Sequence, residues 1–498
     1  MSDQPNLLYI HSDQHSPFVT GCYGDPIVET PHLDSLSENG VVLDNVYCPS
    51  PICVPSRMSM LTGRHPYENR VWTNSQILSS GIPTFAHAMG AAGYRPMLIG
   101  RMHSLGPDQL HGYADRLVGD HGPNQAGSGG GVNRGALEGC AGPSRVSLIN
   151  SGPGQSSYQV HDEDVTAATV NYLNRLGVKK RSGIGDEPFS VSVGFMLPHQ
   201  PFVARREDYA IYEGRMSLPR TAEPFSEKLH PYIAQWRKAT ETVEVTEEEI
   251  LRARTAYWAL VTRMDFMIGE ILEALHRNNL AENTLILYMS DHGEQVGEHG
   301  LWWKQTFYED SVKVPAILSW PGRLPKGVRC ERVVSSLDLN ATMIDALEGP
   351  PLPNSRGRSL LPILSDPSAD WEDVAFSEFC LDSAGSGGPF SEDGVIQRMI
   401  RRGPWKLNYY HGMPCQLFNL DEDPQERDDR AGDLQSQKIR DELLELVLQD
   451  WDPEWVKLQM AAQRQDQRIL GQWGRHVQPP DSIRWPLLAG MDYLDPTD

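Results

Sequence analysis

The chain has 498 residues, which is enough for two or three domains and for a sizeable buried core. It carries 44 Lys and Arg against 66 Asp and Glu, so its net charge is −22 and its surface repels polyanions. This balance argues against a general nucleic-acid binder, because phosphate backbones require a basic footprint. If the substrate is an anion, the cations that bind it must gather locally, inside a pocket.

The N-terminal segment and the cysteines indicate a reducing compartment. The first residues lack a basic region, and their apolar run, 7–10, is too short for a secretory signal. No stretch approaches the roughly 18 apolar residues of a membrane span. The seven cysteines are odd in number and widely scattered, unlike a disulfide framework. We therefore expect a cytoplasmic protein with no membrane partner.

Five short apolar runs, each bounded by polar or turn residues, are predicted to be buried strands. They cover residues 6–11, 95–100, 189–195, 284–289 and 314–320. Helical patterns lie between them, and the clearest begins with a capping box formed by Thr246 and Glu249. Its apolar face is predicted to comprise Tyr257, Leu260, Val261, Met264, Ile268, Ile271 and Leu275. This alternation predicts an α/β fold in which helices sandwich a large, mostly parallel sheet.

The remaining segments differ in composition. Residues 112–160 include glycine-rich 127–131 and show little apolar periodicity, so we expect a long functional loop there. A second glycine-rich stretch, 383–389, precedes a more polar region. We predict two domains, 1–375 and a smaller α+β domain over 376–498. Apolar residues in the tail, such as Trp485 and Leu488, predict that it docks, on a neighbouring subunit, with fraying as the alternative.

Reactive polar residues follow four of the five predicted strands. These are Asp13 and Gln14, then Arg101 and His103, then His199, and finally Asp291 and His292. Because ligands bind outside the carboxyl ends of parallel strands, we expect these side chains to converge. The carboxylates and the imidazole of His292 would suit Ca²⁺, Mg²⁺ or Mn²⁺. A single such pair is more simply a turn cap, but the recurrence on several strands favours a metal site.

A group of cationic residues lies near the same predicted elements. It consists of Arg57, Arg64, Arg101, Lys304, His103 and His199. Converging cations can bind an anionic group and stabilise charge that develops on a leaving oxygen. Taken singly, each of these residues is more simply a solvated surface side chain.

Residues 48–64 read CPSPICVPSRMSMLTGR. The residues alone leave two interpretations of Cys53, a buried structural thiol or a thiolate activated by Arg57 or by a helix N-terminus. The motif Cys-x-Pro-Ser-Arg followed by Leu-Thr-Gly-Arg resembles the signature of the type I sulfatases, in the alkaline phosphatase superfamily. PNLLYIHSDQ, SDHGEQVGEHGLWWKQTFYEDSVKVPAIL and WKLNYY with QLFNLDEDPQE resemble further segments of this family, along nearly the whole chain. The resemblance implies an alkaline phosphatase-like fold with a smaller C-terminal domain.

The resemblance also implies a mechanism. Cys53 would be oxidised to formylglycine by a formylglycine-generating enzyme, and its hydrate would attack the sulfur atom. One divalent cation, Ca²⁺ first and Mn²⁺ or Mg²⁺ as alternatives, would be held by Asp13, Gln14, Asp291, His292 and residue 53. The implied catalytic and substrate-binding residues are Arg57 for the diol, Lys304 and His199 for the leaving group, His103 as base, and Asn74 and Arg101 for the anion. Arg101 stands where the family usually has lysine, and arginine cannot donate its proton.

Two further segments resemble the choline-sulfatase branch, GRMHSLGPDQLHGYADRL and LPHQPFVARREDYAIYEG. The pair Asp13-Gln14 is shared with the phosphonate monoester hydrolases. The implied function is hydrolysis of a small-molecule sulfate ester, and the alternative is a phosphonate monoester or phosphodiester hydrolase using the same site. A third interpretation, an inactive relative, conflicts with the complete set of site residues.

The sequence gives fewer indications of the alcohol part of the substrate and of the oligomeric state than of the reaction. A quaternary ammonium substrate such as choline sulfate would need an aromatic cage. The aromatic candidates are Trp72, Trp302, Trp303 and Tyr113, each of which is otherwise a core residue. The branch and the apolar tail favour a homodimer or a homotetramer.

Overall fold

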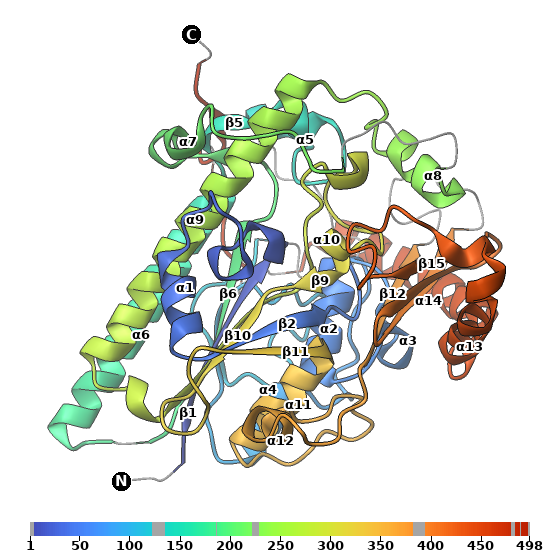
Figure 1. Cartoon of the computed structure of the whole chain (residues 1–498). Helices are drawn as coiled ribbons and strands as arrows, with labels where there is room; N and C mark the ends of the chain where they lie inside the picture. Colours follow the sequence, from blue (N-terminus) through green and yellow to red (C-terminus); the bar gives the residue numbers. More distant parts are fainter. Residues whose placement is uncertain are drawn as a thin grey trace.

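The computed structural model describes residues 4–121, 135–185, 187–221, 229–381, 394–479, 484–488 and 490–496. A large sheet with helices on both faces lies beside a smaller sheet near the C-terminus (Figure 1). The glycine-rich stretch 127–131, predicted as part of a long loop, and the second glycine-rich stretch, 383–389, lie outside the described residues. Within the described ranges, every helix is too short or too polar to cross a lipid bilayer.

The large sheet is mixed and mostly parallel, as predicted. Its strands are β1 (Asn6–Asp13), β2 (Val41–Tyr47), β3 (Met97–Gly100), β4 (Asp115–Arg116), β6 (Ser190–Pro198), β8 (Thr284–Ser290), β9 (Lys313–Val314), β10 (Ala316–Ser319) and β11 (Val328–Ser335). They lie in the order β11-β2-β10-β8-β1-β6-β3-β4, with β9 paired to β2. β9 and β10 run antiparallel to their neighbours, and the other pairs are parallel.

All five predicted strands are present, as β1, β3, β6, β8 and β10. The prediction missed β2 and β11 because polar residues interrupt their apolar patterns. Asp44 and Asn45 divide β2, and the first half of β11 alternates around exposed charged residues. The prediction of a single long loop over 112–160 was wrong for its described part. That part contains β4, α5 (Val146–Ile149), β5 (Gly152–Gln155) and the start of α6 (Ser157–Ser182).

Helices cover both faces of the large sheet (Figure 1). One face carries α1 (Pro31–Glu38), α6 and α9 (Glu247–Arg277), and the other carries α2 (Cys53–Thr62), α4 (Phe85–Ala91) and α11 (Ser336–Ala346). Successive residues of β1 therefore enter different cores. Leu8 and Ile10 belong to the core that contains the apolar face of α9, whereas Leu7 and Tyr9 pack with residues of α4 and α11. This burial on both faces explains why the central strands read as continuous apolar runs.

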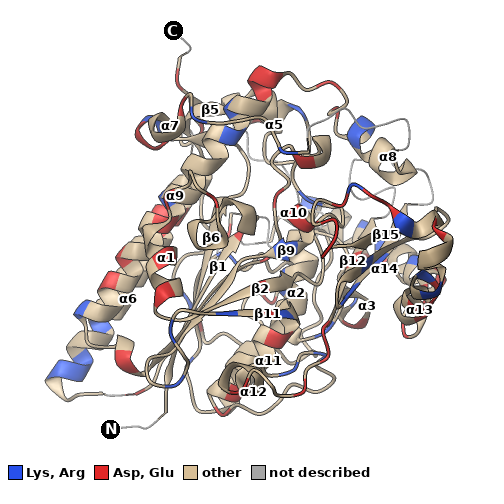
Figure 2. Ribbon diagram, viewed as in Figure 1, with Lys and Arg blue, Asp and Glu red and all other residues tan. Residues whose placement is uncertain are grey.

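The shorter helices lie around these layers. They are α3 (Pro66–Asn69), α7 (Arg206–Tyr212), α8 (Pro231–Ala239), α10 (Glu309–Val312) and α12 (Leu361–Ser365). The long helices follow the expected rules at their ends. α9 begins with the predicted capping box, and all seven residues of its predicted apolar face are buried. α6 ends in Lys179, Lys180 and Arg181, which complement the helix dipole (Figure 2).

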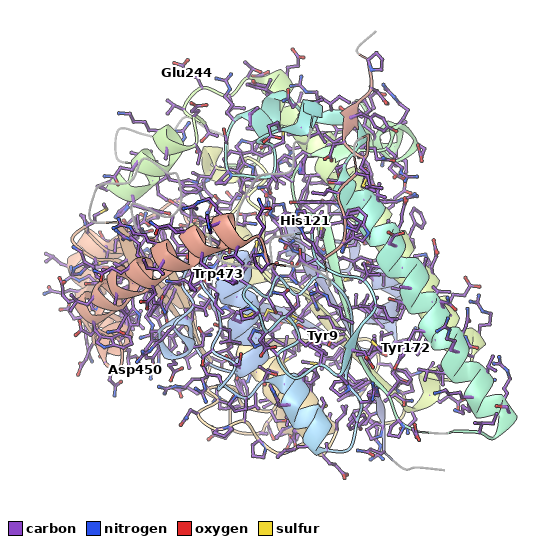
Figure 3. All side chains as sticks on the ribbon, turned by 180° about the vertical axis from the view of Figure 1, so that it is seen from behind. Tyr9, His121, Tyr172, Glu244, Asp450 and Trp473 are labelled. Carbon is purple, nitrogen blue, oxygen red and sulfur yellow. The ribbon has the colours of Figure 1, made fainter. Side chains whose placement is uncertain are left out.

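The smaller sheet is antiparallel and consists of β12 (Val374–Leu381), β13 (Val395–Arg402), β14 (Trp405–Tyr410) and β15 (Gln416–Asn419). α13 (Gln437–Leu448) and α14 (Pro453–Val477) pack against it, which confirms an α+β arrangement. Figure 3 shows α14 from behind, running from this sheet toward the middle of the molecule, with Trp473 labelled. The division at 375/376 stays a prediction, and β12 begins at Val374.

The C-terminal tail docks on its own chain. β16 (Tyr493–Leu494) pairs with β5, which also pairs with β7 (Val203–Ala204). Trp485 is buried, its backbone N–H donates to the Asp120 carbonyl (2.9 Å), and its indole N–H donates to Asp164 (2.8 Å). Docking of the tail is thus confirmed, but the predicted partner, a neighbouring subunit, was wrong for these contacts, because the surface that receives them belongs to the same chain.

Candidate active site

Four neighbouring parallel strands deliver the predicted polar residues to one edge of the sheet. In the order β8-β1-β6-β3, these strands lead into Asp291, Asp13, His199 and Arg101. The close approach of β3 and β6 depends on Gly194, because a Cβ there would overlap the carbonyl oxygen of Arg101. Gln14 and His103 have φ values of 69° and 60°. Such strained backbone conformations in non-glycine residues are typical of functional sites.

Cys53 is the first residue of α2, a helix whose residues are all buried. The helix starts where the motif predicts it and ends at Gly63, which has a φ of 68°. The side-chain oxygen of Asn74 accepts a hydrogen bond from the Val54 N–H at 2.9 Å. This bond satisfies one of the free donors of the first turn and places Asn74 next to Cys53.

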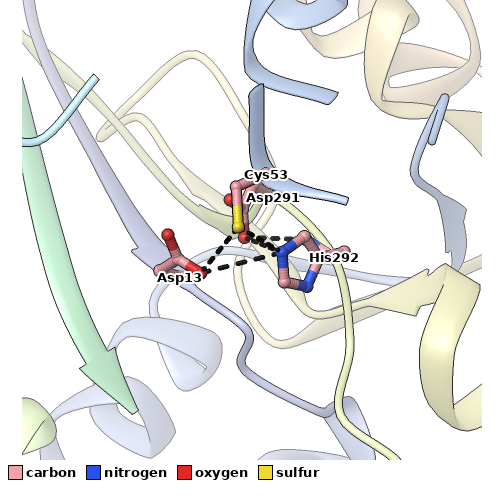
Figure 4. A group of neighbouring side chains, drawn as sticks. All are labelled: Asp13, Cys53, Asp291 and His292. Atoms are coloured by element: carbon pink, nitrogen blue, oxygen red, sulfur yellow. Dashed lines mark hydrogen bonds and ion pairs between the residues drawn. The ribbon is translucent and has the colours of Figure 1, made fainter. Parts of the chain in front are cut away.

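Asp13, Cys53, Asp291 and His292 form a buried cluster whose ligand atoms all lie within 4.8 Å of one another (Figure 4). The His292 Nε2 is 3.2 Å from the Cys53 sulfur, 3.6 Å from Asp291 Oδ1 and 3.7 Å from Asp13 Oδ1. Its Nδ1 donates to the Gly293 carbonyl (3.1 Å), so that Nε2 keeps a lone pair for the cluster. Donor atoms that bind one hard cation at about 2.3–2.6 Å are separated by comparable distances. The donor set therefore fits a divalent cation.

The ligand residues are held in the protonation states that a cation needs. Burial lowers the pKa of His292 to about 4, which keeps the ring neutral. Burial alone would raise the pKa of Asp13, but the positive charges of Arg101, Arg57 and Lys304 outweigh it and hold that pKa well below its ordinary value. Asp13 is therefore an ionised carboxylate in a fully buried place.

Two arginines pair with the cluster carboxylates, and both contact the same oxygen of Asp13, Oδ2. Arg57, fully buried, donates from Nε to Asp291 (2.8 Å) and from Nη2 to Asp13 (3.1 Å). Arg101 donates from Nε to Asp13 (2.7 Å), from Nη1 to Asp120 (3.3 Å) and from Nη2 to His103 Nδ1 (2.9 Å). Every nitrogen of the Arg101 guanidinium is thus occupied by a neighbouring side chain. Its contacts orient Asp13 and His103.

The side-chain ammonium of Lys304 contacts the sulfur of Cys53. Its Nζ is 3.1 Å from the sulfur, 2.5 Å from Gln14 Oε1 and 4.0 Å from Asp13 Oδ1. Burial, with Asp13 as the next cause, raises the pKa of the Cys53 thiol to about 11. A thiol with such a pKa stays protonated at neutral pH, which argues against the interpretation of Cys53 as an activated thiolate.

The two predicted catalytic histidines are uncharged. Burial and the neighbouring Arg101 hold the pKa of His103 well below its ordinary value, and burial and Lys304 do the same for His199. The Nδ1 of His199 donates to the Gln200 carbonyl at 2.6 Å, which leaves Nε2 as its reactive nitrogen. In His103, Nδ1 accepts from Arg101, because arginine only donates.

Some predicted residues lie elsewhere. Arg64, which is half-buried, donates to the Pro353 carbonyl (2.9 Å). The four aromatic candidates for an ammonium cage are core residues, each at most 4% exposed, so this prediction was wrong: Trp72, Trp302, Trp303 and Tyr113. Their large apolar surface is used in packing.

The sequence reading also missed two buried acids. Asp120 accepts hydrogen bonds from Arg101 and from the His103 backbone N–H (3.0 Å). Glu294 contacts the amide of Gln14. Glu294 follows Asp291 by three residues in the motif SDHGE, so its place near the site could have been predicted from the sequence. Asp120 lies in a segment without apolar periodicity, so its place could not.

A carboxylate–histidine–cysteine cluster ringed by buried cations at the carboxyl edge of a parallel sheet defines a hydrolase of anionic esters. A family model described as Sulfatase matches residues 5–349. A second, described as N-sulphoglucosamine sulphohydrolase, C-terminal, matches residues 297–451. The chain belongs to the sulfatase family, and it is a sulfuric ester hydrolase. The family implies a metal ion and a modified cysteine.

Individual relatives agree with this assignment. The chain is 32% identical to a choline-sulfatase of Rhizobium meliloti, over 85% of this chain and 81% of the relative. It is 29% identical to human arylsulfatase K, over 85% of this chain and 78% of the relative. In fold it is similar to the phosphonate monoester hydrolase of Agrobacterium radiobacter, with a TM-score of 0.74, 23% identity and coverage of 90% and 95% of the two chains.

Proposed function

We propose that the protein hydrolyses small alkyl or aryl sulfate monoesters with a formylglycine made from Cys53 and one divalent cation, Ca²⁺ first. The observation that carries the proposal is the convergence of Asp13, Cys53, Asp291 and His292 within 4.8 Å. Gln14 would add a neutral oxygen ligand at the same place. When bound, the cation would polarise oxygen atoms of the substrate and of residue 53. Formylglycine would supply, as its hydrate, a hydroxyl nucleophile.

The chain's own residues would perform the proton transfers and the charge stabilisation. Arg57 orients Asp13 and Asp291 through its two ion pairs. Lys304, with its Nζ 3.1 Å from the Cys53 sulfur, is placed to bind a sulfate oxygen and to donate a proton to the leaving oxygen. His199 would serve the same leaving group through Nε2. His103 would take the proton from the second hydroxyl of residue 53 as sulfate leaves, at Nδ1, where that hydroxyl replaces Arg101 as the hydrogen-bond donor.

The names of the relatives support a small sulfate ester as substrate. The choline-sulfatase relative is the more similar of the two curated relatives described above. The alternative, hydrolysis of phosphonate monoesters, is favoured by the pair Asp13-Gln14 and by a likeness of fold at 23% identity. Sulfate and phosphonate monoesters are both tetrahedral anions, so we expect residual activity toward the second class.

The test compares the two substrate classes directly. The protein is co-produced with a formylglycine-generating enzyme, supplied with Ca²⁺ or Mn²⁺, and assayed with an aryl sulfate, choline sulfate and an aryl phosphonate monoester. We expect kcat/KM for a sulfate ester to exceed that for the phosphonate by at least about tenfold. Faster phosphonate hydrolysis would assign the protein to the alternative class.

The pH dependence of the reaction checks the role of His103. As a base, His103 works when neutral, so activity is present above its pKa and is lost as the pH falls through it. Because burial and Arg101 lower this pKa, we expect the acid limb of kcat, which contains the release of sulfate, below pH 6.5, the ordinary value for histidine. Arg101→Gln removes the charge and the hydrogen bond to Nδ1, so the limb should move to higher pH. An unmoved limb would show that another group titrates.

The remaining expectations belong to the same proposal. We propose a cytoplasmic protein that meets the formylglycine-generating enzyme during maturation and assembles as a homodimer or homotetramer. Exposed apolar side chains on α14 support self-association: Leu458, Ile469, Leu470 and Trp473. Light scattering of the purified protein measures the assembly.

A further inference from the structure

The side-chain amide of Gln14 has different partners at its two ends. Its Nε2 donates to Gln200 Oε1 at 2.6 Å and to the carboxylate of Glu294. Its Oε1 accepts from Lys304 Nζ at 2.5 Å. Since the same Nζ is 3.1 Å from the Cys53 sulfur, the oxygen end faces the cluster and the nitrogen end faces away from it. Gln14 and Glu294 are both fully buried.

The backbone fixes Glu294 independently of Gln14. Glu294 Oε1 accepts hydrogen bonds from the Val296 N–H (2.9 Å) and the Trp303 N–H (2.6 Å). These two donors require an oxygen at that place, which leaves the second carboxylate oxygen, Oε2, for Gln14.

Gln200 is likewise oriented from outside the cluster. Its Nε2 donates to the Ala141 carbonyl at 3.0 Å, so its oxygen must point to Gln14. Gln14 therefore meets two acceptors that other contacts have already oriented. Only a donor at this end of the side chain satisfies both of them.

We propose that Glu294 is the positioning residue that turns the Gln14 amide so that its oxygen faces the cation site. The inference rests on the cation site of the proposed function. It explains why an amide, and not a second carboxylate, follows Asp13. A carboxylate at position 14 would bring its oxygen against oxygens of Glu294 and Gln200, an unfavourable contact between acceptors in a buried place.

The test exchanges the donor and the acceptor. In Glu294→Gln, the new amide must keep its oxygen toward Val296 and Trp303, so its nitrogen faces the nitrogen of Gln14. Gln14 then keeps Gln200 as its single acceptor, and its oxygen is no longer held firmly toward the cation. In Gln14→Glu, two carboxylates meet instead. In the double variant Gln14→Glu/Glu294→Gln, the amide at 294 donates to the carboxylate at 14, the Gln200 amide gives up its bond to the Ala141 carbonyl and turns its nitrogen to the same carboxylate, and an oxygen again faces the cation.

The readout is the Kd for Ca²⁺, measured by calorimetry on chelator-stripped protein with Cys53 unmodified, so that catalysis is not required. Each single substitution should raise the Kd at least about tenfold. The double variant should return to within about threefold of the original protein, a non-additivity that a merely structural role of Glu294 would not produce. Circular dichroism reports whether each variant is folded.

Glu298→Gln is the matched control. Glu298 is also a buried acid of the same loop, but it accepts from Thr221, so this variant should bind Ca²⁺ as tightly as the original protein. An unchanged Kd in Glu294→Gln, or additive losses in the double variant, would overturn this inference and leave the proposed cation site in place. Absence of Ca²⁺ and Mn²⁺ binding by the unaltered protein would overturn the proposed cation site and this inference together.

Discussion

Cys53→Ala is expected to lower kcat/KM for sulfate esters by at least about 10³-fold, while the fold stays intact. The substitution removes the thiol whose oxidation would turn Cβ of residue 53 into the aldehyde carbon, so the hydrate that attacks sulfur cannot form. The small side chain fits the first position of a buried helix, so the loss should be catalytic. Steady-state kinetics and thermal unfolding measure the two effects separately.

Cys380→Ala is the control for this experiment. Cys380 is also buried, but it lies in β12 of the smaller sheet. It should leave kcat/KM near that of the original protein. The mass of the peptide that carries residue 53 identifies the aldehyde in the active preparation. Substantial turnover by Cys53→Ala would contradict the formylglycine mechanism.

Arg57→Met should lower both the stability and the activity of the protein, and its loss of stability should be the largest among the proposed substitutions. Arg57 is completely buried and pairs with both Asp13 and Asp291. An uncharged residue of similar length leaves two buried carboxylates short of one positive charge, which costs about 3–5 kcal/mol for a broken buried pair. We expect a fall in Tm of several degrees in the presence of a chelator.

The cation makes this prediction specific. Bound Ca²⁺ supplies positive charge to the same carboxylates, so the difference in Tm between Arg57→Met and the original protein should shrink when Ca²⁺ is added. Arg356→Met removes an arginine that is 46% exposed and should change Tm little in either condition. Equal losses of Tm with and without Ca²⁺ would show that Arg57 and the cation do not share their carboxylate partners.

The sequence predicted the central part of the fold well because that part is buried on both faces. β1, β6 and β8 are continuous apolar runs whose last residues lead directly into Asp13, His199 and Asp291. The catalytic edge could therefore be predicted from strand ends alone. β11 escaped prediction because half of it is exposed and polar, and β2 because Asp44 and Asn45 interrupt it.

The side-chain partners of the site were harder to predict. Asp120 reaches Arg101 and His103 from a segment after β4 that has no periodic pattern, and its contacts exist only in three dimensions. For the aromatic residues the error was the opposite one: they were predicted as site residues but lie in the core. Trp302 and Trp303 lie close to Lys304 in sequence, but their size places them in the core.

The burial of Cys53 has a consequence for the order of folding and of the proposed modification of this residue. The residue is 1% exposed, and Asp291, His292 and Lys304 close over it from segments about 240 residues further along the chain. A second enzyme cannot reach a side chain enclosed in this way. In the proposed mechanism, conversion of the thiol would therefore take place on the nascent or unfolded chain, before β8 inserts beside β1. A molecule that folds before the modification would keep its thiol, because the modifying enzyme could no longer reach it, and would be well folded but inactive.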